Sequence, residues 1–501
     1  MFSNILIYFV VIPLLMLLGL ALCRNIKQIR AVSVTGALAL TALSVYLLVD
    51  YLALRGAGNH DAMLYVQSWQ WFAPLHINLA VGVDGISVAM LILSSIILLT
   101  GSFASWKIDQ PKEFFLWLIL LSTGVFGFFI SIDLFTMFMF YEVALIPMYL
   151  LIGVWGSGKK NYSAMKLTLM LMGGSAFLML GLIGIYYHSA PEGGQLTWNI
   201  LEIAQNDAIS HGWQKFLFPM TFVGFGVLGA MFPFHTWSPD GHASAPTAVS
   251  MLHAGVLMKL GGYGCFRVAI YLMPYAANEL AWIFLILTGI SVVYGAFSAC
   301  VQTDLKYINA YSSVSHCGLV LFAILMLNTT AMTGAIMQML SHGLMTALFF
   351  ALIGMIYGRT HTRDITKMGG LMKIMPYLAV CYVIADMASL GLPGLSGFVA
   401  EMTIFVGSFE HADMFHRVFT IVACCSIVIT AVYILRVVGK LLFGPVQDKH
   451  HLELTDATWW ERTATATLIV SVAAIGCFPN FFADLIRTTF SPEIFTVIGM
   501  N

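Results

Sequence analysis

Long apolar stretches follow one another along almost the whole chain. A membrane-spanning helix needs about twenty predominantly apolar residues, and fourteen stretches of the 501-residue chain meet this requirement. They are residues 2–23, 31–53, 84–105, 113–131, 133–155, 165–187, 216–235, 245–271, 280–301, 308–327, 331–357, 374–409, 415–443 and 464–487. The pattern therefore predicts an all-α polytopic membrane protein with about 14 transmembrane helices.

Two of these stretches contain residues that interrupt a helix. The seventh reads VGFGVLGAMFPFHTWSPDGHASAP and includes several glycines and Pro233, and the twelfth contains LGLPGLSG around Pro393. Proline removes a backbone donor, and a broken helix is tolerated in a membrane where it is buried in protein or lines a wet cavity. Because the two are five spans apart, equivalent elements would cross in opposite directions, as in inverted repeats. We predict broken helices 7 and 12 in two inverted five-helix repeats; ordinary kinking is the alternative.

This pattern divides the chain into four segments. Residues 1–110 would hold helices 1–3, residues 111–272 the first repeat with helices 4–8, residues 273–445 the second repeat with helices 9–13, and residues 446–501 helix 14. The first stretch lacks a basic start and a small-residue cleavage site. It is therefore expected to be a retained span rather than a signal peptide.

Composition narrows the function classes. The chain is 59% hydrophobic and 9% charged, whereas soluble domains are about 25% charged. The net charge of −1 gives no support for nucleic-acid binding. No two of the eight cysteines are spaced as CxxC, and no phosphate-binding glycine motif stands in its strand–helix context. We expect no metal and no cofactor in this chain.

Basic residues indicate the orientation. Of the 23 Lys and Arg residues, fifteen follow spans 1, 3, 5, 9, 11 or 13, and five lie on the opposite side. Loops rich in Lys and Arg face the cytoplasm. Both termini are therefore expected on the outer side of the membrane.

Ionisable residues occur deep inside several spans. Glu142 is near the middle of span 5, Lys259 near the middle of span 8, Asp386 inside span 12 and Glu401 just after its break. A charge at mid-bilayer costs about 3 kcal/mol or more, and acids, amines and imidazoles can exchange protons through water. The pattern favours a proton path. The histidines in or beside spans are His235, His253, His316 and His342. The alternatives are that Glu142 and Lys259 form a pair that only holds helices together, and that His253 and His342 are packing residues.

Four motifs resemble a known family. FYEVALIPMYLLIG, FPFHTWSPDGHASAPTAVSMLHAGVLMKLGGYG, QTDLKYINAYSSVSHCG and GLPGLSGFVAEM are similar to the antiporter-like membrane subunits of respiratory complex I, the NADH:quinone oxidoreductase. The NuoM type, called subunit 4 in mitochondria, matches best, over about residues 80–445. The resemblance implies fourteen spans, with spans 4–8 and 9–13 as inverted repeats and helices 7 and 12 broken.

The resemblance also implies residue roles. Glu142 would gate proton uptake, Lys259 would be the central lysine, and Glu401 would serve the outer end of the second half-channel. Two histidines would belong to the axis between the halves, and a lysine would lie at the start of span 6. The NuoL type usually has a lysine where this chain has a glutamate in span 12, and the chain ends soon after span 14, without room for a lateral helix. The predicted site residues are Glu142, Lys166, His235, Lys259, His316, His342 and Glu401.

Two positions depart from the family. The span-7 lysine, seven residues before His235, is replaced by Leu228, and Asp386 is an acid where the family usually has an apolar residue. An unpaired buried carboxylate is costly. Glu142 must therefore pair with Lys166 or Lys259, or stay protonated and pass its proton through water. We favour Lys166 or water, for which neighbouring glycines would leave room; the alternative is an inactive first half-channel. These glycines are Gly224, Gly226 and Gly229.

The resemblance implies a proton-translocating subunit without a redox centre in a bacterial inner membrane. NADH, flavin, iron–sulfur clusters and quinone would be bound by other subunits, and the partners would be NuoL-type and NuoN-type neighbours and lipids, with no nucleic acid. The alternatives are a subunit of a multisubunit cation/proton antiporter, a membrane subunit of an energy-converting hydrogenase, and a structural scaffold, for which only Leu228 speaks.

Overall fold

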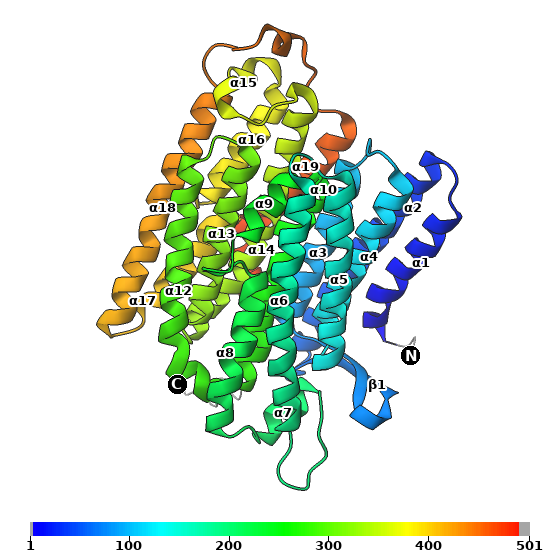
Figure 1. The fold of residues 1–501 in the computed structure, drawn as a ribbon, viewed down its shortest axis with the longest axis vertical. Helices are drawn as coiled ribbons and strands as arrows, with labels where there is room; N and C mark the ends of the chain where they lie inside the picture. The colour runs from blue at the N-terminus through cyan, green and yellow to red at the C-terminus, as the bar shows by residue number, and fades with distance from the viewer. Residues whose placement is uncertain (1–3, 490–501) are drawn as a thin grey trace.

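Long helices run back and forth between two ends of the molecule (Figure 1). The computed structural model describes residues 4–489. Within this range ten helices are long and apolar enough to cross a membrane, or up to eleven if one bent pair counts as a span. The ten are η1 with α1 (Ile5–Leu22), α2 (Ile26–Gly56), α3 (Gly85–Ala104), α4 (Pro111–Ile130), α5 (Leu134–Trp155), α6 (Lys160–Tyr187), α12 (Pro274–Val301), α13 (Leu305–Ile324), α14 (Thr329–Thr360) and α18 (Met414–Leu441).

The other apolar stretches form interrupted helices. Both interruptions predicted from Gly and Pro are present: one separates α8 from α9, and the other separates α16 from α17. Residues 245–271, expected as one span, are helical but include two π-helical turns, η3 and η4. The elements are α8 (His211–Leu228), α9 (Trp237–Ser244), α10 (Thr247–Leu252), η3 (His253–Leu257), α11 (Met258–Gly264), η4 (Cys265–Ile270), α16 (Pro376–Ser389) and α17 (Ser396–Phe409).

The last predicted span, 464–487, is bent rather than straight. Helix α19 (Trp459–Cys477) and helix α20 (Pro479–Arg487) meet at 77°. Pro479 is the first residue of α20, and it has no backbone N–H with which to continue the hydrogen bonding of α19. The expectation of one continuous helix is therefore wrong at this point.

A β-hairpin adds to the predicted all-α fold. Strands β1 (Leu64–Phe72) and β2 (Ile77–Val83) pair antiparallel around a short turn. Figure 1 places this hairpin at one end of the bundle, here named the hairpin end, and α15 at the other, here named the α15 end. The remaining short helices are η2 (Ala73–Leu75), α7 (Ile200–Asn206), η5 (Ile365–Lys367), α15 (Leu371–Ile374) and η6 (Lys449–Glu453).

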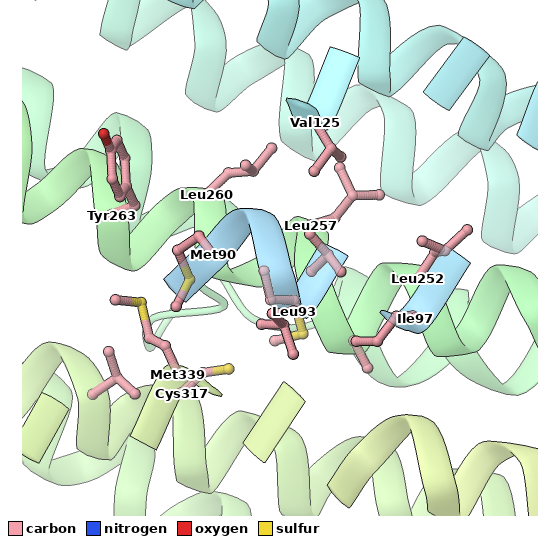
Figure 2. Packing of buried hydrophobic residues seen from close by; sticks show 14 of the residues in the cluster. Met90, Leu93, Ile97, Val125, Leu252, Leu257, Leu260, Tyr263, Cys317 and Met339 are labelled. Carbon is pink, nitrogen blue, oxygen red and sulfur yellow. The ribbon is translucent and has the colours of Figure 1, made fainter. Parts of the chain in front are cut away.

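The helices differ in how far the rest of the chain covers them. Among the span residues of α14, 94% are buried, whereas the corresponding share is 28% for α2 and 33% for α18, which lie towards opposite edges in Figure 1. Figure 2 shows Leu257 of η3 next to Val125 of α4, and Leu260 of α11 near Met90 of α3, so apolar side chains of α3 and α4 pack against this central segment. Polar groups on these central helices are therefore shielded from lipid by apolar side chains of the same chain.

Candidate proton path

Lys259 lies at the centre of the molecule and does not face lipid. Only 1% of the residue is exposed. Its Nζ donates hydrogen bonds to the carbonyl oxygen of Ala254 (2.5 Å) and to Nδ1 of His342 (2.7 Å). Ala254 belongs to the π-helical turn η3, a distortion that occurs often at functional sites. A small cavity, lined also by Gly229 and Gly262, lies beside the lysine and has room for about one water molecule.

Two histidines continue from Lys259 into the second half of the chain. His342 of α14 accepts from the lysine through Nδ1, so its proton in the neutral ring is on Nε2. The ring of His316, from α13, lies 5.2 Å from the ring of His342, centre to centre. The Nε2 atoms of both rings are buried without a hydrogen-bond partner in the described chain. They are therefore free to exchange a proton through an intervening water molecule.

Glu401 follows His316. Its Oε1 lies 3.5 Å from Nδ1 of His316, which Gln338 also approaches to 3.1 Å through Nε2. Nδ1 can therefore accept a hydrogen bond from Gln338 or, when protonated, donate one to the carboxylate. Glu401 lines a small cavity, here named the Glu401 cavity, with room for about one water molecule. Its other polar lining residues are His316, Ser315, Ser389, Ser426 and Thr430. Hydroxyl groups make this cavity suitable for water.

These four side chains, Lys259, His342, His316 and Glu401, are here named the central file. They come from four different helices and form one line of groups that can gain and lose protons. The structural alternative, a pair of Glu142 with Lys259, is not formed among the described residues, because Nζ of Lys259 donates to Ala254 and His342 instead. Two imidazoles separate Lys259 from Glu401. The file can therefore pass protons between its ends.

Lys166 lies elsewhere and has a different partner from the expected one. Its Nζ is 2.6 Å from Oδ2 of Asp240, whose other carboxylate oxygen accepts a hydrogen bond from the Tyr307 hydroxyl (3.0 Å). Asp240 lies on α9 and lines a cleft of about 1020 Å³ with Lys159 and Arg363. Asp240 stands in the motif SPDGH, between two apolar stretches, where an acid is not costly and so gives no signal of its own.

Glu142 has no cation beside it. Its Oε1 is buried without a hydrogen-bond partner, it forms no ion pair among residues 4–489, and its polar neighbour is Ser175 of α6. The expected pairing with Lys166 is not formed, since that lysine binds Asp240. Two alternatives for Glu142 remain. Either the carboxyl carries a proton and exchanges it through water, or the first half-channel is inactive.

The glycines near Leu228 do not leave the expected space. A Cβ atom on Gly224 would lie 2.9 Å from the backbone nitrogen of Leu178, so this glycine serves close packing of α8 against α6. Gly229, by contrast, lines the cavity beside Lys259. The space for water therefore lies near the central lysine and not around Gly224.

His235 stands apart from the central file. It lies in the interruption between α8 and α9, is 3% exposed, and packs against Phe232 and Tyr294, with ring centroids 5.7 Å and 5.0 Å away. Its Nδ1 has no hydrogen-bond partner within the described residues. The structure thus brings four of the seven predicted site residues together and leaves Glu142, Lys166 and His235 separate.

A second histidine pair was not predicted as part of the site. The rings of His242 and His253 lie 4.3 Å apart, and all four ring nitrogens are buried without partners in the part of the chain that is described. Both rings are within electrostatic reach of Lys259. His242 is on the short polar helix α9, outside the apolar stretches, so the hydropathy pattern gives no sign that it is buried.

Two buried cations also hold the fold. Arg267 of η4 forms an ion pair with Asp84, the N-terminal cap of α3, and the two side chains are 3% and 0% exposed. Lys306, expected in a loop, is 5% exposed and donates from Nζ to the carbonyl oxygen of Ala245 (2.5 Å), next to the end of α9. Neither partner could be read from the sequence, because both contacts join distant segments.

Comparison with known proteins supports the resemblance seen in the motifs. The family described as NADH:quinone oxidoreductase/Mrp antiporter, TM matches residues 131–430, more than half of the chain. The NADH-quinone oxidoreductase subunit M of Rickettsia prowazekii (strain Madrid E) is 35% identical over 444 residues, which cover 88% of each protein.

Solved structures share the fold. A chain of respiratory complex I from Thermus thermophilus with bound NADH superposes with a TM-score of 0.88 at 23% identity, covering 99% of this chain and 100% of that one. A chain of the Mrp complex from Dietzia sp. DQ12-45-1b superposes with a TM-score of 0.82 at 20% identity, covering 98% of both. Taken with the sequence matches, these findings establish that the chain belongs to the membrane-protein family shared by NADH:quinone oxidoreductases and Mrp antiporters.

Proposed function

We propose that this chain is a proton-translocating membrane subunit of an NADH:quinone oxidoreductase. The observation that carries the proposal is the central file, which runs buried from Lys259 through two imidazoles to Glu401. Charge changes at Lys259 would alter the proton affinity of His342, and those at His342 the affinity of His316. Redox chemistry in other subunits would drive the change, and NADH, flavin, iron–sulfur clusters and quinone would be bound there.

We infer fourteen spans in two inverted repeats. Four interrupted segments, α8–α9, α10–η4, α16–α17 and α19–α20, add to the ten long helices, and the breaks fall five spans apart, as inverted repeats require. The division at residues 110, 272 and 445 stays a prediction. The excess of Lys and Arg at the α15 end supports a cytoplasmic position for that end, with both termini outside a bacterial inner membrane.

Within such a complex the neighbours would be the NuoL-type and NuoN-type subunits, together with lipids. Helix α5 supports a lateral contact, because only 44% of its span residues are buried by this chain and Glu142 is on it. Helices α2 and α18, at opposite edges, leave further apolar surface for lipid or neighbouring subunits.

A cation/proton antiporter subunit is the main alternative, since the fold is shared with a chain of the Mrp complex. The sequence favours the oxidoreductase, because the relative that is 35% identical over 88% of its length is named a subunit of NADH-quinone oxidoreductase. Purification of the native complex would decide. Subunits that bind NADH are expected, whereas a complex without them that exchanges Na⁺ for protons would contradict the proposal.

Replacement of the central lysine tests the function directly. In the native complex reconstituted into liposomes, Lys259→Met should keep the fold but lose most proton pumping, because the central file then has no cation to exchange with His342. The measurement is the number of protons taken up per NADH oxidised. Lys449→Met, at an exposed lysine of η6, is the matched control and should pump normally. Wild-type pumping by Lys259→Met would refute the proposal.

A further inference from the structure

Asp386 is a buried acid that the central file does not use. It lies on α16, is 1% exposed, and its Oδ2 has no hydrogen-bond partner. Within residues 4–489 it forms no ion pair, so no cation lies within salt-bridge distance of it. An unpaired carboxylate in such a place is costly, which demands either a bound proton or water.

The space beside Asp386 has both polar and apolar walls. A small cavity, here named the Asp386 cavity, has room for about one water molecule. Its polar lining is the side chain of Asp386 with Asn309, Ser312, Ser389 and Tyr433, and its apolar lining includes Phe349, Ile434 and Val437. Nδ2 of Asn309 and Oγ of Ser389 are buried without partners, as is Oδ2 of the acid. Buried polar atoms are bonded to protein or water in nearly all proteins. Three unpaired polar atoms around one cavity therefore indicate that water occupies it.

The Asp386 cavity adjoins the Glu401 cavity. Ser389 lines both of them, at the last residue of α16, where the helix is interrupted. On the other side the Asp386 cavity reaches Leu305 and Ile308, in the first turns of α13. The backbone N–H of Leu305 donates to the carbonyl oxygen of Arg363, in the segment that leads into η5 and α15, so this part of α13 lies towards the α15 end. The two cavities therefore lie in sequence between the start of α13 and Glu401, with Ser389 as their shared wall.

A structural role does not explain Asp386. Buried charges without partners weaken a fold, and apolar replacements of similar size are often neutral or stabilising. Hydrogen bonds to the side chain that would lock α16 in place are lacking within the described residues. The acid therefore lowers the stability of the fold without holding neighbouring helices together. This is expected of a side chain whose role is to carry a proton.

We propose that Asp386 is an additional proton-carrying carboxyl, which supplies Glu401 from the α15 end through the two cavities that meet at Ser389. This inference rests on the proposed function. The Asp386 carboxylate accepts one proton that originates as hydronium in the aqueous phase at the α15 end and is relayed by water on the α13 side, and it becomes the neutral acid. It then releases the proton through cavity water at Ser389 to the Glu401 carboxylate, and its own carboxylate is restored.

The test uses the native complex in liposomes. Asp386→Asn keeps the size of the side chain but cannot carry a proton as the carboxyl does. The variant should assemble normally and slow proton pumping roughly tenfold or more, the scale on which a missing proton-transfer group acts. Asp386→Glu should restore a large part of the rate. Cys381→Ala, at a buried residue of the same helix, is the matched control and should pump normally.

A spectroscopic measurement separates proton carriage from packing. Infrared difference spectra between the oxidised and reduced complex should contain a carboxylic acid band that disappears in Asp386→Asn. Should that variant fail to assemble, Ser389→Val fills the junction of the cavities without touching the acid, and it should slow pumping as well.

The outcomes are distinct for the two proposals. The role of Asp386 would be overturned if Asp386→Asn assembles and pumps normally, or if Ser389→Val pumps normally. If Glu401→Gln loses pumping in the same assay, the proposed function stays intact. Normal pumping by Glu401→Gln as well would overturn the proposed function. Loss in Asp386→Asn with an unchanged infrared band would assign the acid to packing and overturn the inference.

Discussion

At the scale of single residues, Glu142 differs from the central file because it has no charged or imidazole partner. The replacement Glu142→Gln therefore removes no ion pair, and the complex should assemble in normal amounts. If the carboxyl carries protons in the first repeat, pumping per NADH should fall. Native gel electrophoresis gives assembly, and proton uptake by liposomes gives pumping.

Lys166→Met provides the comparison for Glu142. It breaks the pair with Asp240, whose side chains are 23% and 24% exposed, and such a pair is worth about 0–1 kcal/mol. This variant should lower stability slightly, unlike Glu142→Gln. Normal pumping by Glu142→Gln would show that protons reach Lys259 without this carboxyl. Substitutions of the buried histidines His242 and His253 would then test the other route to the lysine.

The sequence predicts a functional residue well where a charged side chain stands inside an apolar run. It predicts a residue's role poorly where that role depends on a partner from a distant segment. Lys259 and Glu401 stand out as charges within apolar runs. The partner of Lys166, Asp240, is 74 residues away, and His242 lies on a short polar helix. A contact between such distant segments depends on how the helices pack, which hydropathy does not encode.

At the scale of elements, the interruption between α16 and α17 shapes the surroundings of Glu401. Gly391 there has φ +66, and a Cβ atom on it would lie 3.0 Å from Oε2 of Glu401. Gly394 has φ +92 but open space around it. Both Gly391 and Gly394 thus adopt a positive φ that favours glycine, but only Gly391 also lies close to the Glu401 carboxylate.

This difference gives a prediction for the interruption. Gly391→Ala and Gly394→Ala should each cost about 1 kcal/mol of stability because both force an L-residue to positive φ. Only Gly391→Ala should also lower proton pumping, since it displaces the Glu401 side chain. Gly439→Ala, in α18 with nothing near its Cβ position, is the control and should be neutral or slightly stabilising. Equal pumping by the two interruption variants would contradict a role for the contact.

The elements themselves were largely predictable. Apolar length identified the long helices, and the residues of GLPGLSG identified the break after α16. Pro479 signalled the bend between α19 and α20, but the apolar run on both sides obscured it. The strands β1 and β2 alternate apolar and polar residues over only a short stretch, which is a weak signal for a hairpin. The π-helical turns around Lys259 have no sequence signature, because packing of neighbouring helices produces them.

At the scale of the whole molecule, one buried ion pair joins the N-terminal helices to the central helix that carries Lys259. Asp84 caps α3, and Arg267 belongs to η4, which directly follows α11, the helix that carries Lys259. The hydroxyls of Ser87 in α3 and Tyr263 in α11, 2.8 Å apart, form a second link between α3 and the central helix. The position of the central lysine relative to α3 therefore depends on these contacts.

The ion pair gives a prediction about assembly rather than chemistry. Arg267→Met should destabilise the chain by about 3–5 kcal/mol, because it leaves Asp84 charged, buried and unpaired. Asp84→Asn combined with Arg267→Met should recover much of that loss, since no unpaired charge remains. Thermal unfolding of the detergent-solubilised complex, compared across the single and double variants, measures the coupling between the two positions. Additive losses would show that the pair contributes no specific link. Recovery with normal proton pumping would show that the link holds α3 against the central helix and that its charges take no part in proton transfer.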